Sequence, residues 1–166
     1  HRDLHSFPTR RSSDLLCSAI SATKSKEIIE SRGHKVSKIN IFPIVVSDEI
    51  ESVTKTKNMI KILDSLNLLQ DVRRLDARKP RTGKSSLRGR GTKIGKSVLF
   101  VVAKSEKLSK ACKGIPGIDV KLAKDLSVLD LAPGGAPIRL TVYSKSAIEE
   151  IAKIKSPHLE LMVTIK

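Results

Sequence analysis

Apolar side chains recur every three to four positions in several segments of this chain, and that period predicts helices. The clearest segment is 55–69, where one helix face would be apolar from end to end. Its stripe consists of Met59, Ile60, Leu63, Leu66 and Leu69. By the same criterion, we expect helices over residues 15–31, 106–113 and 146–154, and a helical turn over 121–126.

Short continuous apolar runs between these segments predict buried strands. The runs at 42–46 and 98–103 are the strongest, because uninterrupted Val, Ile, Leu and Phe residues are typical of strands covered on both faces. A third strand is expected over 139–144, where the pattern alternates. Weaker strand signals lie at residues 72–75 and 117–120.

The order of these elements indicates the fold class. Helices alternate with buried strands through most of the chain, which is the pattern of an α/β protein. We therefore predict a mostly parallel central sheet flanked by helices, a Rossmann-like three-layer sandwich, with a basic extended loop between residues 77 and 97.

A length of 166 residues fits one domain, and both ends of the chain lie outside its pattern. Residues 1–15 have no clear period and resemble translated sequencing-adapter sequence, so we expect them to be non-native and disordered. A native basic arm is the alternative. The α/β domain is expected over residues 16–154, as a fragment of a longer protein, and a tail over 155–166.

Charge narrows the class of partner. The chain has 32 Lys and Arg against 17 Asp and Glu, a net charge of +15, and its 39% hydrophobic content excludes a wholly disordered protein. A folded chain this basic favours a polyanion, most often nucleic acid and next an anionic membrane surface. Only 2% of residues are aromatic, which favours contacts to phosphates and shape over base stacking.

The cations concentrate in residues 78–96, named here the basic loop. This segment holds four glycines and no acidic residue. Glycines let a backbone adopt positive φ and approach phosphates closely, and arginine forks match phosphate oxygens. We interpret the loop as an RNA-binding element rather than a solvated linker. Its eight cations are Arg78, Lys79, Arg81, Lys84, Arg88, Arg90, Lys93 and Lys96.

Enzyme chemistry has weaker support. The Gly83-Lys-Ser run and the glycines of 89–95 lack the spacing of nucleotide-binding motifs, and both lead into a strand where those motifs open a helix. Asp130 is expected to cap a turn rather than to catalyse, and Cys17 and Cys112 to fill helix cores. The four histidines have no metal-ligand spacing. We expect no cofactor and no metal, and a nucleotide-dependent α/β enzyme remains the alternative function.

Several short motifs combine into a pattern that none of them carries alone. They are Ser18-Ala-Ile-Ser-Ala-Thr23 with Arg32-Gly-His34, Pro43-Ile-Val-Val-Ser-Asp48, Arg88-Gly-Arg90 with Val98-Leu-Phe-Val-Val102, Gly114-Ile-Pro-Gly117, and Asp130-Leu-Ala-Pro-Gly-Gly-Ala-Pro137. The last run, with the strand that follows it, is the most specific. In this order and spacing, residues 16–154 resemble the archaeal and eukaryotic type of the universal large-subunit ribosomal protein L-four family.

The resemblance implies a non-enzymatic constituent of the large ribosomal subunit that supports subunit assembly and translation in the cytoplasm. It implies large-subunit rRNA and neighbouring ribosomal proteins as partners, with no membrane and no small-molecule substrate. The family's long tunnel-reaching loop precedes the matched residues. Carried over to this sequence, the rRNA contacts expected first are Arg81, Lys84, Arg88 and Arg90, followed by Arg78, Lys79, Lys93 and Lys96.

Overall fold

Four short parallel strands form the centre of the molecule. The structure is a computed structural model, and it describes residues 7–76, 79–91, 94–135 and 138–153. Its strands are β1 (Ile44–Val46), β2 (Leu99–Val102), β3 (Asp119–Leu122) and β4 (Thr141–Ser144), in the spatial order β1-β4-β2-β3. Every neighbouring pair is parallel, which confirms the predicted α/β class and parallel sheet.

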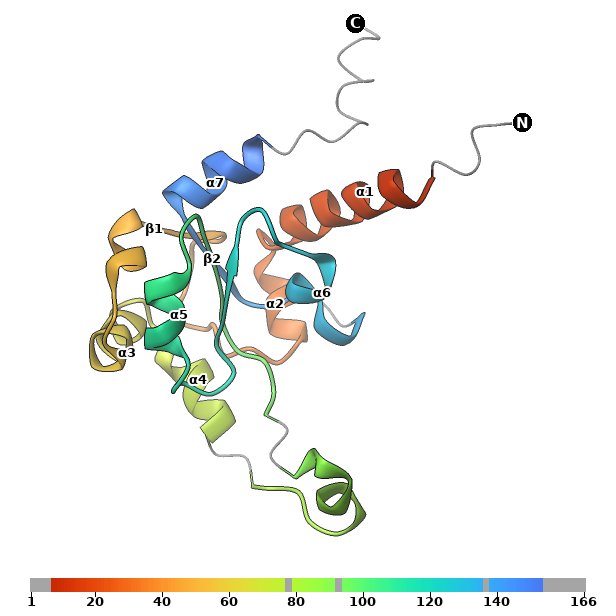
Figure 1. Ribbon diagram of the computed structural model, residues 1–166, viewed down its shortest axis with the longest axis vertical. Coiled ribbons are helices and arrows are strands. Elements are labelled where there is room, and N and C mark those ends of the chain that lie inside the picture. Colours follow the sequence, from red (N-terminus) through yellow and green to blue (C-terminus); the bar gives the residue numbers. More distant parts are fainter. Residues whose placement is uncertain (1–6, 77–78, 92–93, 136–137, 154–166) are drawn as a thin grey trace, which may run out of the picture.

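Helices cover both faces of this sheet and produce three layers (Figure 1). Along β2, Phe100 and Val102 pack into a core with helices on one face, and Leu99 and Val101 pack into a second core on the other. Such alternation follows from the two-residue period of a strand. The described helices are α1 (Phe7–Ala22), α2 (Lys26–Ser31), α3 (Thr56–Ser65), α4 (Leu69–Asp76), α5 (Glu106–Cys112), α6 (Val128–Leu131) and α7 (Lys145–Ala152).

Three shorter helical turns complete the described elements: η2 (Asp48–Ser52), η3 (Ser86–Arg90) and η4 (Pro133–Gly135). The helices expected over 106–113 and 146–154 are confirmed as α5 and α7, with small shifts of their ends. Within the described ranges, no helix is both long and apolar enough to cross a membrane. The predicted tail, residues 155–166, lies outside those ranges.

The helix expected over 15–31 is two helices. α1 begins at Phe7, eight residues earlier than expected, and ends at Ala22; α2 then starts at Lys26. Thr23 lies in the turn between them, and its hydroxyl donates to the carbonyl of Ile20 at 2.6 Å. Hydroxyl side chains compete with helical hydrogen bonding in this way, so a helix readily breaks there. Cys17 is exposed on α1, against expectation, whereas Cys112 is buried as expected.

The weak strand expected over 72–75 is wrong, because these residues belong to helix α4. Asn67 takes a left-handed conformation with φ of 58°, which ends the preceding helix α3 and lets a separate helix follow. Val72 and Leu75 are both buried, and a spacing of three places them on one face of that helix. A run of four residues is too short to distinguish the period of a helix from that of a strand.

The weak strand expected over residues 117–120 lies two residues later than expected. β3 covers Asp119–Leu122, and Leu122 pairs with Val102 of β2, so the helical turn expected from residue 121 is wrong at its start. Gly117 has φ of +74°, outside the range of a regular strand, which keeps it in the preceding turn. Pairing with the central strand β2 therefore set the position of β3, and no local pattern revealed it.

Candidate nucleic-acid interface

The basic loop joins helix α4 to strand β2, and it extends from the body as a separate lobe below the sheet (Figure 1). The strands expected at residues 72–75 and 98–103 would place the loop between two strands, and that placement is wrong. The element before it is helical, and β2 has a neighbour on each side, β4 and β3. The last residues of the loop thus lead into the amino-terminal end of the central strand β2, close to the core.

The far part of the loop, residues 81–91, is named here the loop tip, and backbone hydrogen bonds close it on itself. Arg81 N donates to the carbonyl oxygen of Gly91 at 3.0 Å across the neck. Inside, Ser86 N and Leu87 N both donate to the carbonyl oxygen of Gly83, at 3.0 and 3.2 Å. Gly83 and Gly89 have φ of 66° and 68°, so two of the loop glycines supply the positive φ that we expected.

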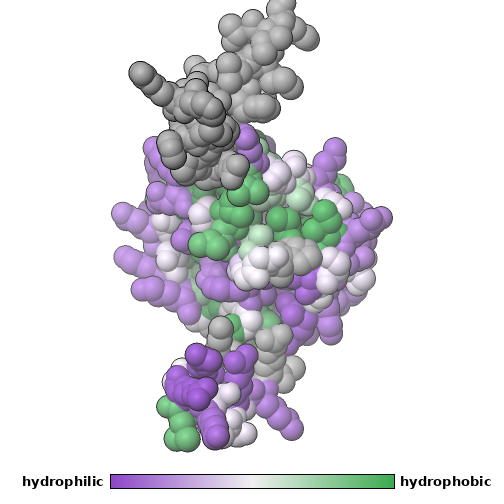
Figure 2. All heavy atoms as spheres, turned by 90° about the vertical axis from the view of Figure 1, so that its right-hand side faces the viewer, coloured by the Kyte–Doolittle hydropathy of each residue, from purple (hydrophilic) through white to green (hydrophobic). Residues whose placement is uncertain are grey.

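Five of the eight predicted contact residues lie exposed on this lobe. Figure 2 shows the lobe as mostly hydrophilic, below a body of mixed character. Within the described residues, no ion pair joins any of these five cations to a carboxylate, so their charges face water uncompensated. They are Lys79, Arg81, Lys84, Arg88 and Arg90. Arg78 and Lys93 lie outside the described residues.

Lys96 differs from the other predicted contact residues. Its ammonium lies 2.8 Å from Oδ2 of Asp119, at the start of β3. That carboxylate also accepts a hydrogen bond from Nη1 of Arg139 at 2.6 Å, so one acidic residue is shared by two cations. Lys96 therefore contributes to holding the end of the loop at the sheet, and less of its charge is available to a ligand.

Two buried charges anchor the end of the loop, and the first is Asp71 of α4. Its side chain is 0% exposed. It accepts hydrogen bonds from Ser97 Oγ at 2.6 Å and from Lys35 N at 3.0 Å, with His34 Nδ1 at 2.9 Å. Burial by itself would raise the pKa of Asp71, but hydrogen bonds from His34, Arg74 and Ser97 lower that pKa well below its ordinary value.

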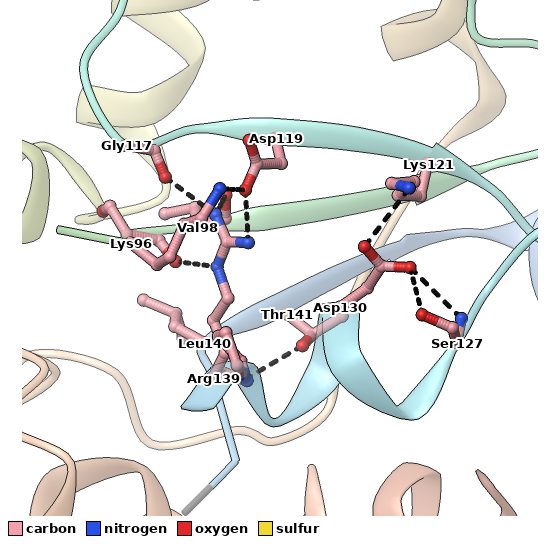
Figure 3. A network of polar contacts seen from close by, with 12 residues as sticks. Lys96, Val98, Gly117, Asp119, Lys121, Ser127, Asp130, Arg139, Leu140 and Thr141 are labelled. Atoms are coloured by element: carbon pink, nitrogen blue, oxygen red, sulfur yellow. Dashed lines mark hydrogen bonds and ion pairs between the residues drawn. The ribbon is translucent and has the colours of Figure 1, made fainter. Parts of the chain in front are cut away.

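The second anchor is Arg139, whose side chain is 1% exposed and lies just before β4 (Figure 3). Nε donates to the carbonyl oxygen of Ser97 at 2.5 Å, and Nη2 donates to those of Val98 and Gly117 at 2.9 and 2.7 Å. A guanidinium presents its donors in a rigid plane, so one side chain holds two backbone segments together, at residues 97–98 and at residue 117. We name Asp71, Ser97, Asp119 and Arg139 the base cluster.

Parallel topology explains why the base cluster forms. Ser97 precedes β2, Asp119 begins β3, and Arg139 precedes β4. The amino ends of parallel strands meet at one edge of a sheet, so residues far apart in sequence gather there. The sequence pattern did not reveal this cluster. Its one available signal was an arginine between Ile138 and Leu140, in a segment that otherwise reads as a buried strand.

Asp130 is confirmed as a capping residue. Its Oδ2 accepts from Ser127 N at 3.2 Å and from Ser127 Oγ at 2.7 Å, which closes a capping box on α6. Its other oxygen lies 3.3 Å from Lys121 Nζ (Figure 3). Among the described residues, no group of three or more His, Cys, Asp and Glu side chains is placed to hold a metal ion.

The carboxyl edge of the sheet is the usual ligand site of open α/β proteins, and here a carboxylate occupies it. Glu51 of η2 accepts hydrogen bonds from the backbone N–H groups of Ala103 and Lys104 at 2.8 and 3.2 Å. Backbone N–H groups at this position are what a nucleotide phosphate would need. The neighbouring cleft of about 590 Å³ adds Asp48 and Glu106 to its lining. This geometry does not favour the nucleotide-dependent alternative.

Comparison with known proteins gives a consistent result over most of the chain. The profile of the ribosomal protein L4/L1 family matches residues 5–154. This match starts eleven positions before the resemblance noted over residues 16–154, so it includes part of the segment 1–15, whose adapter-like origin stays a prediction.

The relatives are proteins named large ribosomal subunit protein uL4. That of Sulfurisphaera tokodaii is 46% identical over 140 residues, which are 83% of this chain and 52% of the relative. That of Methanococcus aeolicus is 44% identical over 139 residues, 83% of this chain and 55% of the relative. That of Haloarcula marismortui is 39% identical over 136 residues, 82% of this chain and 54% of the relative.

The chain thus spans about half the length of the curated relatives that it matches. In this chain, the residues matched by the family profile include the whole described α/β domain, with its basic loop and base cluster. Because the family profile covers most of the chain and the predicted parallel α/β architecture is present, the chain belongs to the ribosomal protein L4/L1 family.

Proposed function

We propose that this chain is a non-enzymatic constituent of the large ribosomal subunit, which binds large-subunit rRNA through its loop tip and supports subunit assembly and translation in the cytoplasm. The observation that carries the proposal is the set of exposed, uncompensated cations on a lobe that projects from a family member's fold. Neighbouring large-subunit ribosomal proteins are the further partners that we propose, in line with the names of the relatives.

Binding would act through phosphate neutralisation. The loop tip carries Arg81, Lys84, Arg88 and Arg90, with Lys79 just before it, and a nucleic acid releases condensed counterions for each phosphate that such a cation contacts. Stacking on bases has little support, because the aromatic side chains of Phe100 and Tyr143 are buried in the sheet. The contacts would therefore be made to the RNA backbone and its shape.

The base cluster would make this binding more effective by holding the end of the loop in place. Ser97 is fixed from two sides, by its hydroxyl on Asp71 and by its carbonyl oxygen on Arg139. A loop held at its base loses less conformational entropy when it meets a ligand than a free linker does. In this arrangement Asp71 and Arg139 position the loop, and they are buried away from any RNA surface.

A salt titration tests the proposal. Arg81, Lys84, Arg88 and Arg90 are replaced together by Ala, and filter binding to large-subunit rRNA of Sulfurisphaera tokodaii is measured between about 50 and 200 mM KCl. Each phosphate contact contributes about 0.7–0.9 to the slope of log affinity against log salt, so we expect the slope of this variant to fall by about three.

A matched control removes four exposed lysines elsewhere, so that the net charge changes equally. Lys55, Lys57, Lys104 and Lys107 are suitable because they precede or begin α3 and α5, and none belongs to the basic loop. We expect the control variant to keep nearly the wild-type slope. Equal slopes for the wild type, the loop variant and the control would overturn the proposal.

A further inference from the structure

One side chain of the loop tip does not fit a purely electrostatic element. Leu87 is 87% exposed, the highest value among the exposed large hydrophobic residues of the described chain. It is the only large hydrophobic residue within 79–91. In Figure 2 an apolar patch stands out at the end of the otherwise hydrophilic lobe. An apolar group at the end of a cationic projection is in position to touch whatever the cations bind.

Folding does not explain the position of Leu87. It belongs to neither of the two hydrophobic cores. The loop tip is closed by backbone hydrogen bonds, of which Leu87 N to the carbonyl oxygen of Gly83 is one, at 3.2 Å. That bond uses the backbone of Leu87 and would survive a change of its side chain. The side chain is therefore available for an intermolecular contact.

The surroundings of Leu87 indicate the chemistry of its partner. The next residue is Arg88, and Lys84 and Arg90 lie three positions to either side, all exposed and without a carboxylate partner in the described chain. A ligand for this surface must present phosphates around an apolar patch. Folded RNA does so where stacking is interrupted, because a base at a loop or bulge exposes its face between flanking phosphates.

We propose that Leu87 is a specificity-determining residue, whose side chain packs against the face of an unstacked base in folded rRNA while the neighbouring cations hold the phosphates on either side. This inference rests on the proposed function, and it adds a contact that phosphate neutralisation does not supply. A continuous duplex keeps its bases stacked, so Leu87 would find no such surface there. Leu87 would thus favour folded rRNA over duplex RNA of equal charge.

The two kinds of contact differ in their response to salt. Cation–phosphate contacts set the slope of log affinity against log salt, whereas an apolar contact changes affinity by the same factor at every salt concentration. Replacing Leu87 by Ala removes three carbon atoms from the contact. At the usual free energy per buried methylene group, partial burial of that surface corresponds to about a tenfold change in affinity.

The test measures filter binding of four proteins to Sulfurisphaera tokodaii large-subunit rRNA and to a continuous RNA duplex, over the same salt range. We expect Leu87→Ala to bind the rRNA about tenfold more weakly at every salt concentration, with an unchanged slope and wild-type affinity for the duplex. Leu87→Met keeps the apolar volume and should bind like the wild type.

The fourth protein is the control Leu129→Ala. Leu129 is 76% exposed but belongs to α6, in the body rather than in the loop, so this variant should bind rRNA like the wild type. Thermal melting of each variant checks that folding is unchanged. Equal rRNA affinity for Leu87→Ala and the wild type would overturn the inference. So would equal weakening on rRNA and duplex, since that would mean a non-specific contact.

The two proposals fail in different ways. If the four-cation variant flattens the salt slope but Leu87→Ala binds rRNA like the wild type, RNA binding stands and the role of Leu87 is lost. If the four-cation variant keeps the wild-type slope, the proposed function fails whatever Leu87 does. A Leu87→Ala protein that binds rRNA normally but is depleted from reconstituted large subunits would assign the side chain to a protein contact instead, and would also overturn the inference.

Discussion

The loop tip and the base cluster lie at opposite ends of one segment, and each is built around arginine. Arg88 in the loop tip is exposed, and no carboxylate of the described chain pairs with it. Arg139 in the base cluster is 1% exposed, pairs with Asp119, and donates hydrogen bonds to three carbonyl oxygens. The same type of side chain is thus exposed without a carboxylate partner at one end and buried among its partners at the other.

The base cluster and the loop tip differ in whether their charged side chains have partners within the chain. A buried charge without partners costs several kcal/mol, so every charge in the base cluster has partners within the chain. An exposed charge costs little, so the cations of the loop tip can stay uncompensated until a ligand arrives. Substitutions in the two regions should therefore separate stability from binding, and the predictions below run from the largest expected effect on stability to the smallest.

Asp71 should have the largest effect. Replacing it by Ala leaves its partners Ser97 and His34 without their acceptor in the core, beside Arg74. Removing one member of a buried charged network costs about 3–5 kcal/mol of unfolding free energy. Urea unfolding measures that loss. Asp64→Ala, at an exposed position of α3, is the control and should change the free energy of unfolding by less than about 0.5 kcal/mol.

The same residue predicts a dependence of stability on pH. Because the pKa of Asp71 is lowered in the folded state, its contribution is fully present above the pKa of the unfolded chain, near 4. Below that pH the unfolded state binds a proton that the folded state does not, so the free energy of unfolding falls as pH falls. Asp71→Asn should flatten this fall below about pH 5. An unchanged profile would mean that Asp71 does not anchor the base cluster.

Gly117 should have an intermediate effect, because its backbone and its surroundings both exclude a side chain. Its φ is +74°, and a Cβ there would overlap a methyl carbon of Leu75 and lie 2.8 Å from the carbonyl oxygen of Gly95. Left-handed strain and overpacking together should lower the free energy of unfolding of Gly117→Ala by about 2–4 kcal/mol. Urea unfolding again provides the measurement.

Gly134→Ala separates those two contributions. Gly134 has φ of +78°, but a Cβ there would meet no atom within 4 Å. Its substitution by Ala should therefore add only left-handed backbone strain and lower the free energy of unfolding by about 1–2 kcal/mol. If both variants lost the same free energy, the packing of the turn at residue 117 against the end of the loop would contribute nothing, and the base cluster would be less rigid than its contacts indicate.

The parts of the structure that depend on neighbouring residues were predictable from the sequence. The buried strands at residues 98–103 and 139–144, the acid-free loop and the capping role of Asp130 all depend on residues close together in the chain. The base cluster joins Asp71 to Ser97 and Ser97 to Arg139, across 26 and 42 positions. Such contacts exist only once the strand order is known. For the same reason Lys96 was grouped with the loop, although its partner Asp119 places it with the base cluster.

The four-cation loop variant should have the smallest effect on stability. Arg81, Lys84, Arg88 and Arg90 are exposed, and surface substitutions away from caps and partners usually change stability by less than about 0.5 kcal/mol each. Their removal also lowers the net charge from +15 to +11, which reduces self-repulsion and favours the folded state slightly. We therefore expect thermal melting within a few degrees of the wild type, alongside the weakened RNA binding. A clearly lower melting temperature would mean that the loop tip supports the fold, and the division between a binding end and a folding end would not hold.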